Sequence, residues 1–465
     1  MPRPRQLDPA SLTLRLQTQG PLTAQAMAAV VGVDRSRVSR ALTELGESIV
    51  RLGTTRGTRY ALRRAVRGLG HTFPVRRIDA EGRAQEWVEL TSLHGGWRVT
   101  WADTARVPAW AEWVIALGGW SDGFPFFLSD LRPQGYLGRL VGRALPPALG
   151  LAPDPRDWSD DDTLVFLQSE GDDLPGDLVV GDRPLQRVQR RHLEPASEAI
   201  AESGRASRYP VLAENVSASG HGGSSVEGEQ PKFLAVLDTA TGCTPVLVKF
   251  TDRLSTPTGR RWADLLVAEA HALAILHEHG EALAVPRVLD AGGRRFLEMM
   301  RFDRVGHRGR RGVVSLRALH DTFAGADTAE WKVRALAFER EGLITAETLR
   351  SISLRHTFGR LIGNIDMHFG NLAFWLDDSL PFRLAPAYDM LPMLWAPVPG
   401  NATPSPDFAP PPPLPSERGR WSEAAAWAAD FWSRVIADER VSAEFATRAR
   451  GAAAVVTRMR AQFAE

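Results

Sequence analysis

LIGNIDMHFGNLAFWLDDSLPFRLAPAYDM, residues 361–390, is the most informative stretch of the sequence. It contains Asp366, then Asn371 five residues later, and Asp389 beyond a short apolar segment. This order is typical of phosphoryl-transfer sites, where the first Asp accepts the proton of the attacking hydroxyl while the Asn and the second Asp hold metal ions on the phosphates. The stretch therefore predicts a phosphoryl-transfer loop.

The pattern around this loop predicts its local structure. An amphipathic helix is expected over 345–362, and Gly363 suits the left-handed residue that ends many helices. Two short apolar strands are expected at 372–376 and 382–384, with Asp and Ser turning the chain between them. The loop would then lie between a helix end and a hairpin.

Asparagine usage separates a functional reading of the loop from a structural one. Loop Asp and Asn residues commonly shape turns or cap helices, which is the alternative here. The chain contains only four asparagines, however, and two of them, Asn364 and Asn371, fall within eight residues. The other turns are built from Gly, Pro, Asp and Ser, so we interpret this set as functional.

Length and composition indicate a folded protein of two or three domains. The chain has 465 residues, 44% of them hydrophobic, with 14 tryptophans, and this length exceeds one ordinary core. Its single cysteine, Cys243, excludes an internal disulfide. No signal-peptide core and no apolar run of 18 residues is present. We expect a cytoplasmic protein that does not contact a membrane.

Positive charge is concentrated near the N-terminus. Residues 1–65 contain eleven arginines, no lysine and four acidic residues, a net charge of +7 in a chain whose total is +1. Such a segment suits a polyanion. Three helices are expected here, then a hairpin: 11–19, 22–31, 34–45 and 49–63.

This pattern predicts a winged helix-turn-helix in residues 1–66 that binds double-stranded DNA. The outward face of the third helix and the hairpin carry the predicted contacts, which are Arg35, Ser36, Arg37, Ser39, Arg40, Arg56 and Arg59. The alternative is a small helical bundle with a solvated basic face. Because the basic residues gather on the helix and the hairpin together, we favour DNA binding.

Residues 70–200 carry less information. Short strands are expected at 75–78, 87–93 and 97–101, and a helical part at 110–149. The carboxylates of the 169–181 segment, Asp172, Asp173 and Asp177, match no calcium loop, so we favour a structural role for them.

Lysine usage points to a second functional region at 217–250, where a Gly/Ser loop leads into a hairpin. Such a loop can fold its backbone N–H groups around phosphates. Of 56 basic residues only three are lysine, and two of these, Lys232 and Lys249, fall on the hairpin strands. Lys249 stands in an apolar strand and needs a partner if buried. The helix expected at 262–279 offers Glu269 on its apolar stripe, which predicts a Lys–Glu pair.

A strand expected at 295–302 would line an adenine pocket. Its Met299, Met300 and Phe302 are either core residues or adenine contacts.

Taken together, these residues resemble the HipA-type serine/threonine kinases of bacterial toxin–antitoxin systems. The resemblance runs from Ser217 onwards and is carried by five motifs. These are S-x-x-G-x-Q-x-K (225–232), the strand lysine Lys249, RFDR (301–304), N-x-D-x-H-x-x-N (364–371) and P-x-Y-D (386–389).

The resemblance implies an α+β multidomain protein. The winged helix-turn-helix would be followed by a small β-rich subdomain at 67–200 and by a bilobal kinase-like domain with a helical C-lobe at 201–465. It implies ATP and Mg²⁺ as cofactors, with Asp366 as catalytic base, Asn371 and Asp389 as metal ligands, and Lys249 on the phosphates.

Further roles follow from the same resemblance. It implies autophosphorylation at Ser225, which would expel the nucleotide loop, and Ser224 could compete. The remaining implied ATP contacts are Val226, Glu227, Gly228, Glu229, Gln230, Pro231, Lys232, Met300, Arg301, Phe302 and His368.

Two features depart from the common family pattern. Gly370 stands just before Asn371, where members often carry a basic residue, so the charge of the transition state would have to be stabilised by another group. The DNA-binding element is fused in cis, as in the YjjJ-like subgroup, whereas the usual system places it on a separate antitoxin. An antitoxin partner and a homodimer are left open.

Three functions therefore stand at this point. The first is a protein kinase that phosphorylates serine in a protein substrate, with aminoacyl-tRNA synthetases as candidate targets because family members modify them. The second is an ATP-sensing, DNA-binding transcription regulator with an inactive kinase-like domain. The third is a small-molecule kinase, against which the Ser225 loop argues.

Overall fold

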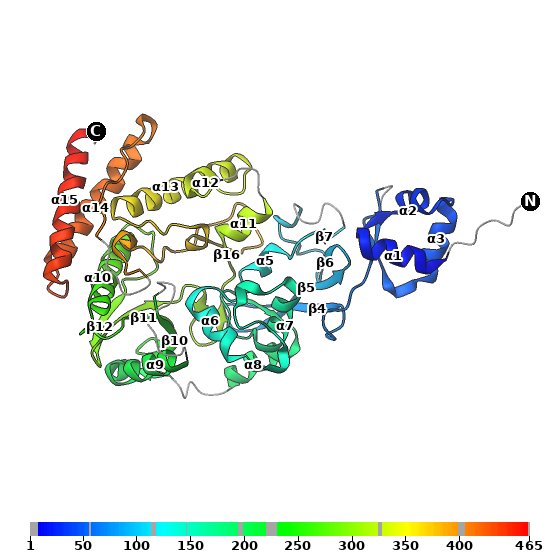
Figure 1. The fold of residues 1–465 in the computed structure, drawn as a ribbon, viewed down its shortest axis with the longest axis horizontal. Coiled ribbons are helices and arrows are strands. Elements are labelled where there is room, and N and C mark those ends of the chain that lie inside the picture. Colours follow the sequence, from blue (N-terminus) through cyan, green and yellow to red (C-terminus); the bar gives the residue numbers. More distant parts are fainter. Residues whose placement is uncertain are drawn as a thin grey trace, which may run out of the picture.

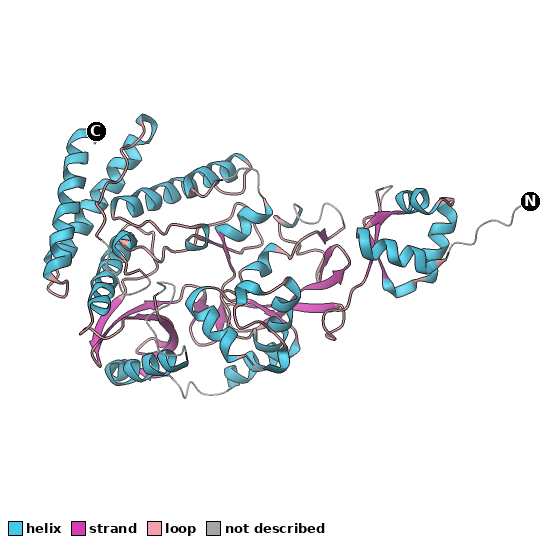
Figure 2. Cartoon of the chain, viewed as in Figure 1, coloured by secondary structure: helices cyan, strands magenta, loops and turns pink. Residues whose placement is uncertain are grey.

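The computed structural model describes residues 8–54, 57–112, 118–145, 147–193, 199–219, 230–323, 328–398 and 405–463. Its elements form a mixed α+β protein whose N-terminal unit lies at one end of the long axis and whose last two helices lie at the other (Figure 1). Two five-stranded sheets occupy the middle, with helices around them (Figure 2).

The N-terminal unit contains three helices and a small antiparallel sheet. Its elements are α1 (Pro9–Gln19), β1 (Leu22–Thr23), α2 (Ala24–Val31), α3 (Arg35–Glu44), β2 (Ile49–Leu52) and β3 (Arg59–Leu62), with the strand order β1-β3-β2. Asp8, Thr23 and Asp34 cap the three helices with side-chain oxygens, as expected for N-cap residues. The predicted helix and hairpin positions are reproduced.

The middle unit is an antiparallel sheet with the order β7-β6-β5-β4-β8. Its strands are β4 (Thr72–Ile78), β5 (Ala84–Leu93), β6 (Gly96–Trp101), β7 (Trp120–Ser121) and β8 (Leu178–Val180), and its helices are α5 (Phe126–Ser129), α6 (Gly135–Ala144), α7 (Asp160–Glu170) and α8 (Asp182–Leu193).

The expectation of a helical part over 110–149 is only partly met. Strand β7 and the short helix α5 precede α6, which is the one longer helix in the described part of this segment. Edge-to-face contacts join the rings of Trp110, Phe126, Phe127 and Trp87 into a cluster. These aromatic side chains pack as a cluster rather than as a helical stripe.

The second sheet has the order β12-β13-β11-β10-β9, with β9 parallel to β10 and the other pairs antiparallel. Its strands are β9 (Ile200–Ala201), β10 (Lys232–Thr239), β11 (Gly242–Phe250), β12 (Arg287–Ala291) and β13 (Arg294–Met300). Helix α9 (Arg205–Ser219) packs with Val248 and Phe250, whereas α10 (Pro257–Glu278) packs with Leu297 of β13. Because side chains alternate along a strand, Lys249 points towards α10.

The C-terminal part is mainly helical. It contains β14 (Arg304–Val305), β15 (Gly309–Arg310), β16 (Val313–Ser315), β17 (Ala373–Trp375), α11 (Leu316–Thr322), α12 (Trp331–Arg340), α13 (Ala346–Leu361), α14 (Arg418–Ala437) and α15 (Ala443–Phe463). The strand expected at 382–384 is reduced to a bridge between Leu384 and Phe374. In the described ranges, no helix is long and apolar enough to cross a membrane.

One hydrophobic core joins the middle unit to the C-terminal part. It includes Trp110 and Phe126 together with Leu319, Trp331 and Phe374. The indole N–H of Trp110 also donates to the carbonyl of Asp377 over 2.9 Å. The middle sheet is therefore packed against the region that carries the predicted phosphoryl-transfer loop.

Candidate functional site

The predicted pair of Lys249 and Glu269 is present and buried. Strand β11 carries Lys249, which is 3% exposed, and α10 carries Glu269, which is fully buried. The Lys249 ammonium donates to both carboxylate oxygens of Glu269, over 2.6 and 2.8 Å. Burial raises the pKa of Glu269, because the charged carboxylate has left water.

Asp389 is the second partner of Lys249, with 2.5 Å between Nζ and Oδ1. Its φ of 52° lies in the left-handed region, which is uncommon for a residue other than glycine and frequent at functional sites. Burial raises the pKa of Asp389, but the charge of Lys249 outweighs it and holds the pKa below the usual range. For Lys249, burial lowers the pKa, and the charges of Asp389 and Glu269 outweigh this and raise it.

Asn364 connects the loop of Asp366 to that of Asp389. It is buried, its side-chain oxygen accepts the Asp366 N–H over 3.0 Å, and its amide donates to the Asp389 carbonyl over 3.1 Å. Asn371 completes the loop, because its amide donates to the Asp366 carbonyl over 2.7 Å. The three polar residues predicted from spacing are thus held in one constellation, and the Asp366 side chain is exposed.

Gly370 is required by the close approach of His368. The His368 Nδ1 accepts the Gly370 N–H over 3.0 Å, and a Cβ at Gly370 would lie 2.9 Å from the His368 ring. The Gly370 carbonyl accepts from the Tyr388 hydroxyl over 2.8 Å. Any residue with a side chain at position 370 would displace the His368 ring.

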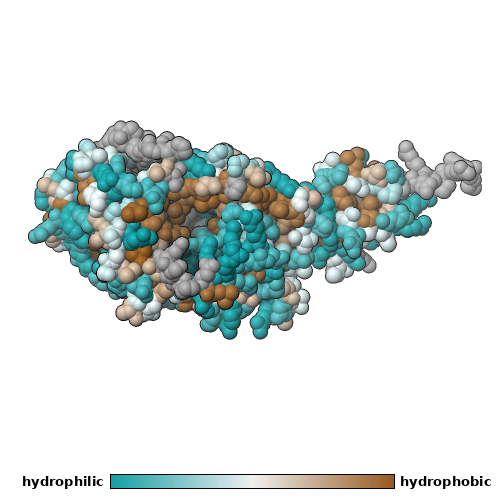
Figure 3. Space-filling model, turned by 90° about the horizontal axis from the view of Figure 1, so that it is seen from below, coloured by the Kyte–Doolittle hydropathy of each residue, from teal (hydrophilic) through white to brown (hydrophobic). Residues whose placement is uncertain are grey.

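Two adjoining cavities meet at these residues. The first cavity has a volume of about 580 Å³ and mostly apolar walls, and the second has a volume of about 970 Å³ and contains Asp366 and Asn371. Both are lined by Lys232, Lys249 and Asp389. Hydrophobic surface gathers around a hollow in the central part of the face shown in Figure 3.

The donor set fits a nucleotide with Mg²⁺. Magnesium takes oxygen ligands and is commonly held by one or two protein groups together with substrate phosphates. Asn371 and Asp389 supply such oxygens at the second cavity, and Lys232 and Lys249 supply positive charge for phosphates. Among the residues described, no group of three or more His, Cys, Asp or Glu could hold a metal ion.

The middle unit supplies a wall of the first cavity that sequence reasoning missed. This wall consists of residues 130–138 with Leu140 and Val141, around α6, and of residues 173–175. They face Met299, Met300 and Phe302 at the end of β13. The aromatic ring of Phe302 stacks on Tyr388 with 5.7 Å between ring centroids. No local pattern in the sequence marked 130–141 as part of a site.

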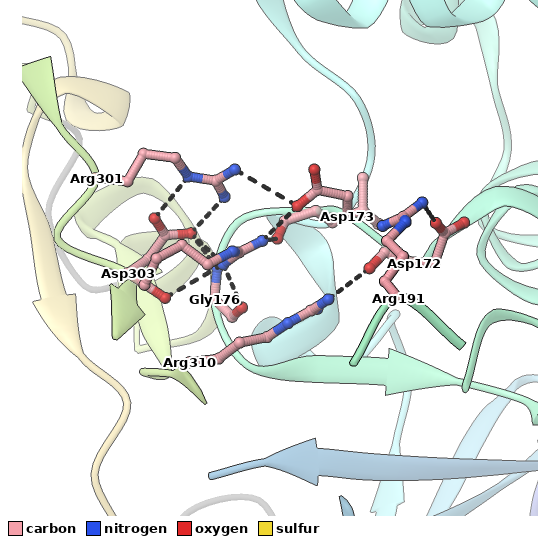
Figure 4. Close-up of polar contacts among 9 residues, drawn as sticks. Asp172, Asp173, Gly176, Arg191, Arg301, Asp303 and Arg310 are labelled. Carbon is pink, nitrogen blue, oxygen red and sulfur yellow. Dashed lines mark hydrogen bonds and ion pairs between the residues drawn. The ribbon is translucent and has the colours of Figure 1, made fainter. Parts of the chain in front are cut away.

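A buried charge network fixes this wall (Figure 4). Asp303 accepts hydrogen bonds from the guanidiniums of Arg301 and Arg304 over 2.7–3.0 Å and from the Gly176 N–H over 3.0 Å. Asp173 accepts from the same two arginines over 3.4 and 2.8 Å. The loop 172–177 of the middle unit is therefore tied to the segment that follows β13.

The other partners of this network explain its acidic residues. Arg310 donates to the Asp172 carbonyl over 2.6 Å, and the Asp172 carboxylate pairs with Arg191 (Figure 4). The same carboxylate also pairs with Arg187 over 2.8 Å. Burial lowers the pKa of Arg310 to about 9, and the charge of Arg304 adds to this. Asp172 and Asp173, for which the sequence favours a structural role, thus form ion pairs with arginine side chains.

The remaining predicted nucleotide contacts, together with the predicted autophosphorylation sites Ser225 and Ser224, divide into four groups. Met300, Arg301 and Phe302 line the first cavity, although the Arg301 guanidinium is engaged by Asp303. Gln230 and His368 line the second, and the Gln230 amide donates to the Phe250 carbonyl. The carbonyl of Pro231 accepts the Phe250 N–H over 2.9 Å. Outside the described residues lie Ser224, Ser225, Val226, Glu227, Gly228 and Glu229.

The predicted DNA contacts lie on α3 and β3. Arg35, Ser36, Ser39 and Arg40 are exposed, and Arg37 is half-buried and paired with Asp34 over 3.1 Å. The guanidinium of Arg59 lies over the Trp120 ring, 5.7 Å from its centroid. Arg56 lies outside the described residues.

Comparisons with known proteins agree with this architecture. A family model for the middle domain of YjjJ-like toxins matches residues 69–189, and a model for the HipA-like C-terminal domain matches residues 224–463. The chain is 35% identical over 432 residues to Toxin YjjJ of Escherichia coli K12, covering 92% of this chain and 94% of that relative. The class is that of HipA-like toxins. Within it, the chain belongs to the YjjJ-like family, which confirms the predicted resemblance.

One solved structure shares the fold at low sequence identity. A chain from the Shewanella oneidensis MR-1 toxin–antitoxin complex of HipA, HipB and operator DNA aligns with a TM-score of 0.51 and 15% identity, covering 83% of this chain and 97% of that chain. The Helicobacter pylori proinflammatory kinase CtkA aligns over 50% of this chain and 93% of its own at 12% identity, but its TM-score of 0.34 is too low to establish a common fold.

Proposed function

We propose that this protein is an ATP- and Mg²⁺-dependent protein kinase that transfers the γ-phosphoryl group to serine. The observation that carries the proposal is the constellation in which Asn364 holds Asp366 and Asp389 together while Lys249 contacts both Glu269 and Asp389. Phosphoryl transfer depends mainly on positioning and charge stabilisation, and this constellation provides both.

Each residue has a distinct role in this proposal. Asp366 is exposed at the second cavity and would accept the proton of the attacking serine hydroxyl. Asn371 and Asp389 would hold Mg²⁺, which when bound neutralises charge on the phosphates. Glu269 keeps the Lys249 ammonium charged and oriented within a buried site.

The adenine base would occupy the first cavity. Apolar side chains from β10, β11 and β13 line it, among them Leu234, Leu247 and Met299. The Phe302 ring, stacked on Tyr388, closes one side. A pocket that is mostly apolar with a few polar groups at one end is the usual form of a small-molecule site.

The experiment that tests this proposal is phosphate mapping. Purified protein would be incubated with ATP and Mg²⁺ beside its Asp366→Asn variant, with Asp377→Asn, a half-buried aspartate of the same segment that pairs with Arg383, as the matched control. We expect phosphate on Ser225 or Ser224 in the parent and in the control, and none in Asp366→Asn. A parent that binds ATP and acquires no phosphate would contradict kinase activity.

We also propose that residues 1–66 form a winged helix-turn-helix that binds double-stranded DNA. The helix α3 presents four of the predicted contacts, Arg35, Ser36, Ser39 and Arg40, as exposed side chains next to a two-stranded hairpin. This arrangement suits a major groove and its flanking phosphates. The solved HipA complex contains operator DNA and HipB. Here the DNA-binding element would be in cis.

The second candidate function is an ATP-sensing transcription regulator, favoured by the same exposed face of α3. It predicts operator binding that changes with ATP, without phosphate transfer.

For the kinase, a serine in a protein is the proposed acceptor, and an aminoacyl-tRNA synthetase is a candidate target by family resemblance. A small-molecule acceptor is the third candidate.

A further inference from the structure

Arg317 lies at the proposed phosphate site and has no role in the constellation described so far. It is the second residue of α11, it is exposed, and it lines the second cavity together with Asp366 and Asn371. Its Nε lies 4.0 Å from the point where a Cβ of Gly370 would stand. The guanidinium therefore occupies the space beside the residue that precedes Asn371.

The backbone of Arg317 is fixed relative to Asn371. Its neighbour Leu316 donates its N–H to the Leu372 carbonyl over 2.8 Å, and Ser315 pairs with β17 at Ala373. The half-buried carboxylate of Asp130 accepts from both the N–H and the hydroxyl of Ser315, over 2.6 and 2.7 Å. The start of α11 and the predicted metal-binding loop thus form one rigid piece.

Charge partners distinguish Arg317 from other arginines of this cavity. Arg132 pairs with Asp160 over 3.0 Å, and Arg156 pairs with Asp154 over 2.6 Å. Within the described ranges, Arg317 has no carboxylate within 4.0 Å and no hydrogen bond from its guanidinium. An arginine offers five donors in a planar fork that matches phosphate oxygens. Its free donors face a cavity that Asp366, Asn371 and Lys249 share.

We propose that Arg317 binds the terminal phosphate of a nucleoside triphosphate and stabilises the charge on the phosphoryl group in transfer. This inference rests on the proposed kinase function. In the step, the bond from the γ-phosphorus to the bridging oxygen breaks, and a bond to the serine oxygen forms. The serine proton goes to Asp366, and the diphosphate leaves with the bridging oxygen. Arg317 exchanges no proton and contributes charge-assisted hydrogen bonds.

The terminal phosphate is favoured over the α- and β-phosphates by position. Lys249 is buried deep at the junction of both cavities, next to Asp389. Arg317 lines the second cavity, as Asp366 does, and is absent from the walls of the first. Arg317 lies on the same side as Asp366, the proposed catalytic base, and would therefore contact the γ-phosphate, which is the group transferred to the acceptor serine. A nucleoside diphosphate has no γ-phosphate.

The test compares binding of ATP and ADP, with Mg²⁺, to the full chain. The Asp366→Asn background prevents turnover, and Arg317→Ala and Arg317→Lys are made in it. We expect Arg317→Ala to weaken ATP binding by about tenfold or more, because the terminal phosphate loses a charge-assisted hydrogen-bond donor. ADP binding should change less than about twofold on the same scale. Arg317→Lys should fall between, because an ammonium keeps the charge and loses the fork.

Arg156→Ala is the matched control, because Arg156 lines the same cavity and is held by Asp154. It should leave the ratio of ATP to ADP affinity unchanged. Equal weakening of both nucleotides by Arg317→Ala, or no weakening of either, would overturn the inference. The experiments distinguish a wrong role for Arg317 from a wrong proposed function. A protein without the Arg317 substitutions that transfers no phosphate refutes the kinase activity. The effect of Arg317→Ala on the ratio of ATP to ADP affinity still decides whether Arg317 binds the terminal phosphate. A protein that binds neither nucleotide refutes both.

Discussion

Replacing Asp303 by asparagine should loosen the wall that the middle unit contributes to the first cavity. Asp303 is 7% exposed and receives four hydrogen bonds, from Arg301, Arg304 and the Gly176 backbone. Burial raises the pKa of Asp303, but the charges of Arg304 and Arg301 outweigh it and lower the pKa, so the group is ionised at neutral pH. The substitution keeps the volume and removes the charge.

The expected loss of folding stability depends on which hydrogen-bond acceptors Arg301 and Arg304 keep after the substitution. Removing one partner of a buried ion pair costs about 3–5 kcal/mol, because the other charge stays buried without compensation. Asp173 still accepts from Arg304 over 2.8 Å and from Arg301 over 3.4 Å, which places the cost at the lower end. A loss of about 3 kcal/mol lowers the unfolding midpoint of a unit of 150–250 residues by about 6–12 °C.

Thermal unfolding of the full chain and hydrogen exchange of the 172–177 amides measure this effect. The exchange readout is local, and the Gly176 N–H, which loses its carboxylate acceptor, should lose protection. The control is Asp430→Asn, which breaks an exposed pair with Arg434 and should cost less than about 1 kcal/mol. A midpoint within 2 °C of the parent, about what the control allows, together with unchanged exchange at 172–177 would refute the reasoning.

Three further predictions address the site and the N-terminal unit. Glu269→Gln should lower autophosphorylation about tenfold or more in a phosphate-incorporation assay, because Lys249 loses the carboxylate that orients it. His356→Phe should flatten the fall in stability on acidification. Burial lowers the pKa of His356 to about 3, so below about 6.5 the unfolded chain takes up a proton that the folded chain refuses. Between pH 6.5 and pH 5 the parent should therefore lose about 2 kcal/mol more than the variant in denaturant titrations, and an equal loss in the two proteins would contradict this cause. Replacing Arg35 and Arg40 by alanine should weaken DNA binding and reduce the slope of log affinity against log salt by about one per arginine, and an unchanged slope would exclude their contact with phosphate.

Residue usage and spacing predicted the centre of the site, because these properties are local. Lys249 stood out in a chain that otherwise uses arginine, and Glu269 stood out on an apolar helix stripe. Both are buried and bonded to each other. Asp366 and Asn371 were recognised by their separation of five residues, and that loop geometry is set within a few residues of chain.

The walls of the site could not be predicted because they depend on contacts between distant segments. Asp130 fixes Ser315 across 185 residues of chain, and the Gly176 N–H reaches Asp303 across 127. Neither contact leaves a periodicity in the sequence around it. Arg317 was overlooked for the same reason: an exposed arginine near the start of a short helix has no local signal, and only the packing of α11 against the loop of Asn371 brings it to the cavity.

The attachment of the N-terminal unit bears on how the proposed DNA-binding element relates to the site. Strand β3 continues into a bridge between Arg63 and Leu93 of β5, and the Arg64 N–H donates to the Ser92 carbonyl over 3.0 Å. The Arg64 guanidinium also pairs with Asp161 of α7. These are backbone and ion-pair contacts to the sheet whose helices wall the first cavity. A shift of the N-terminal unit on DNA would therefore act on the middle sheet directly. That sheet reaches the proposed nucleotide site in two ways, through the 172–177 loop tied to Asp303 and through the hydrophobic core that it shares with Phe369 and Phe374.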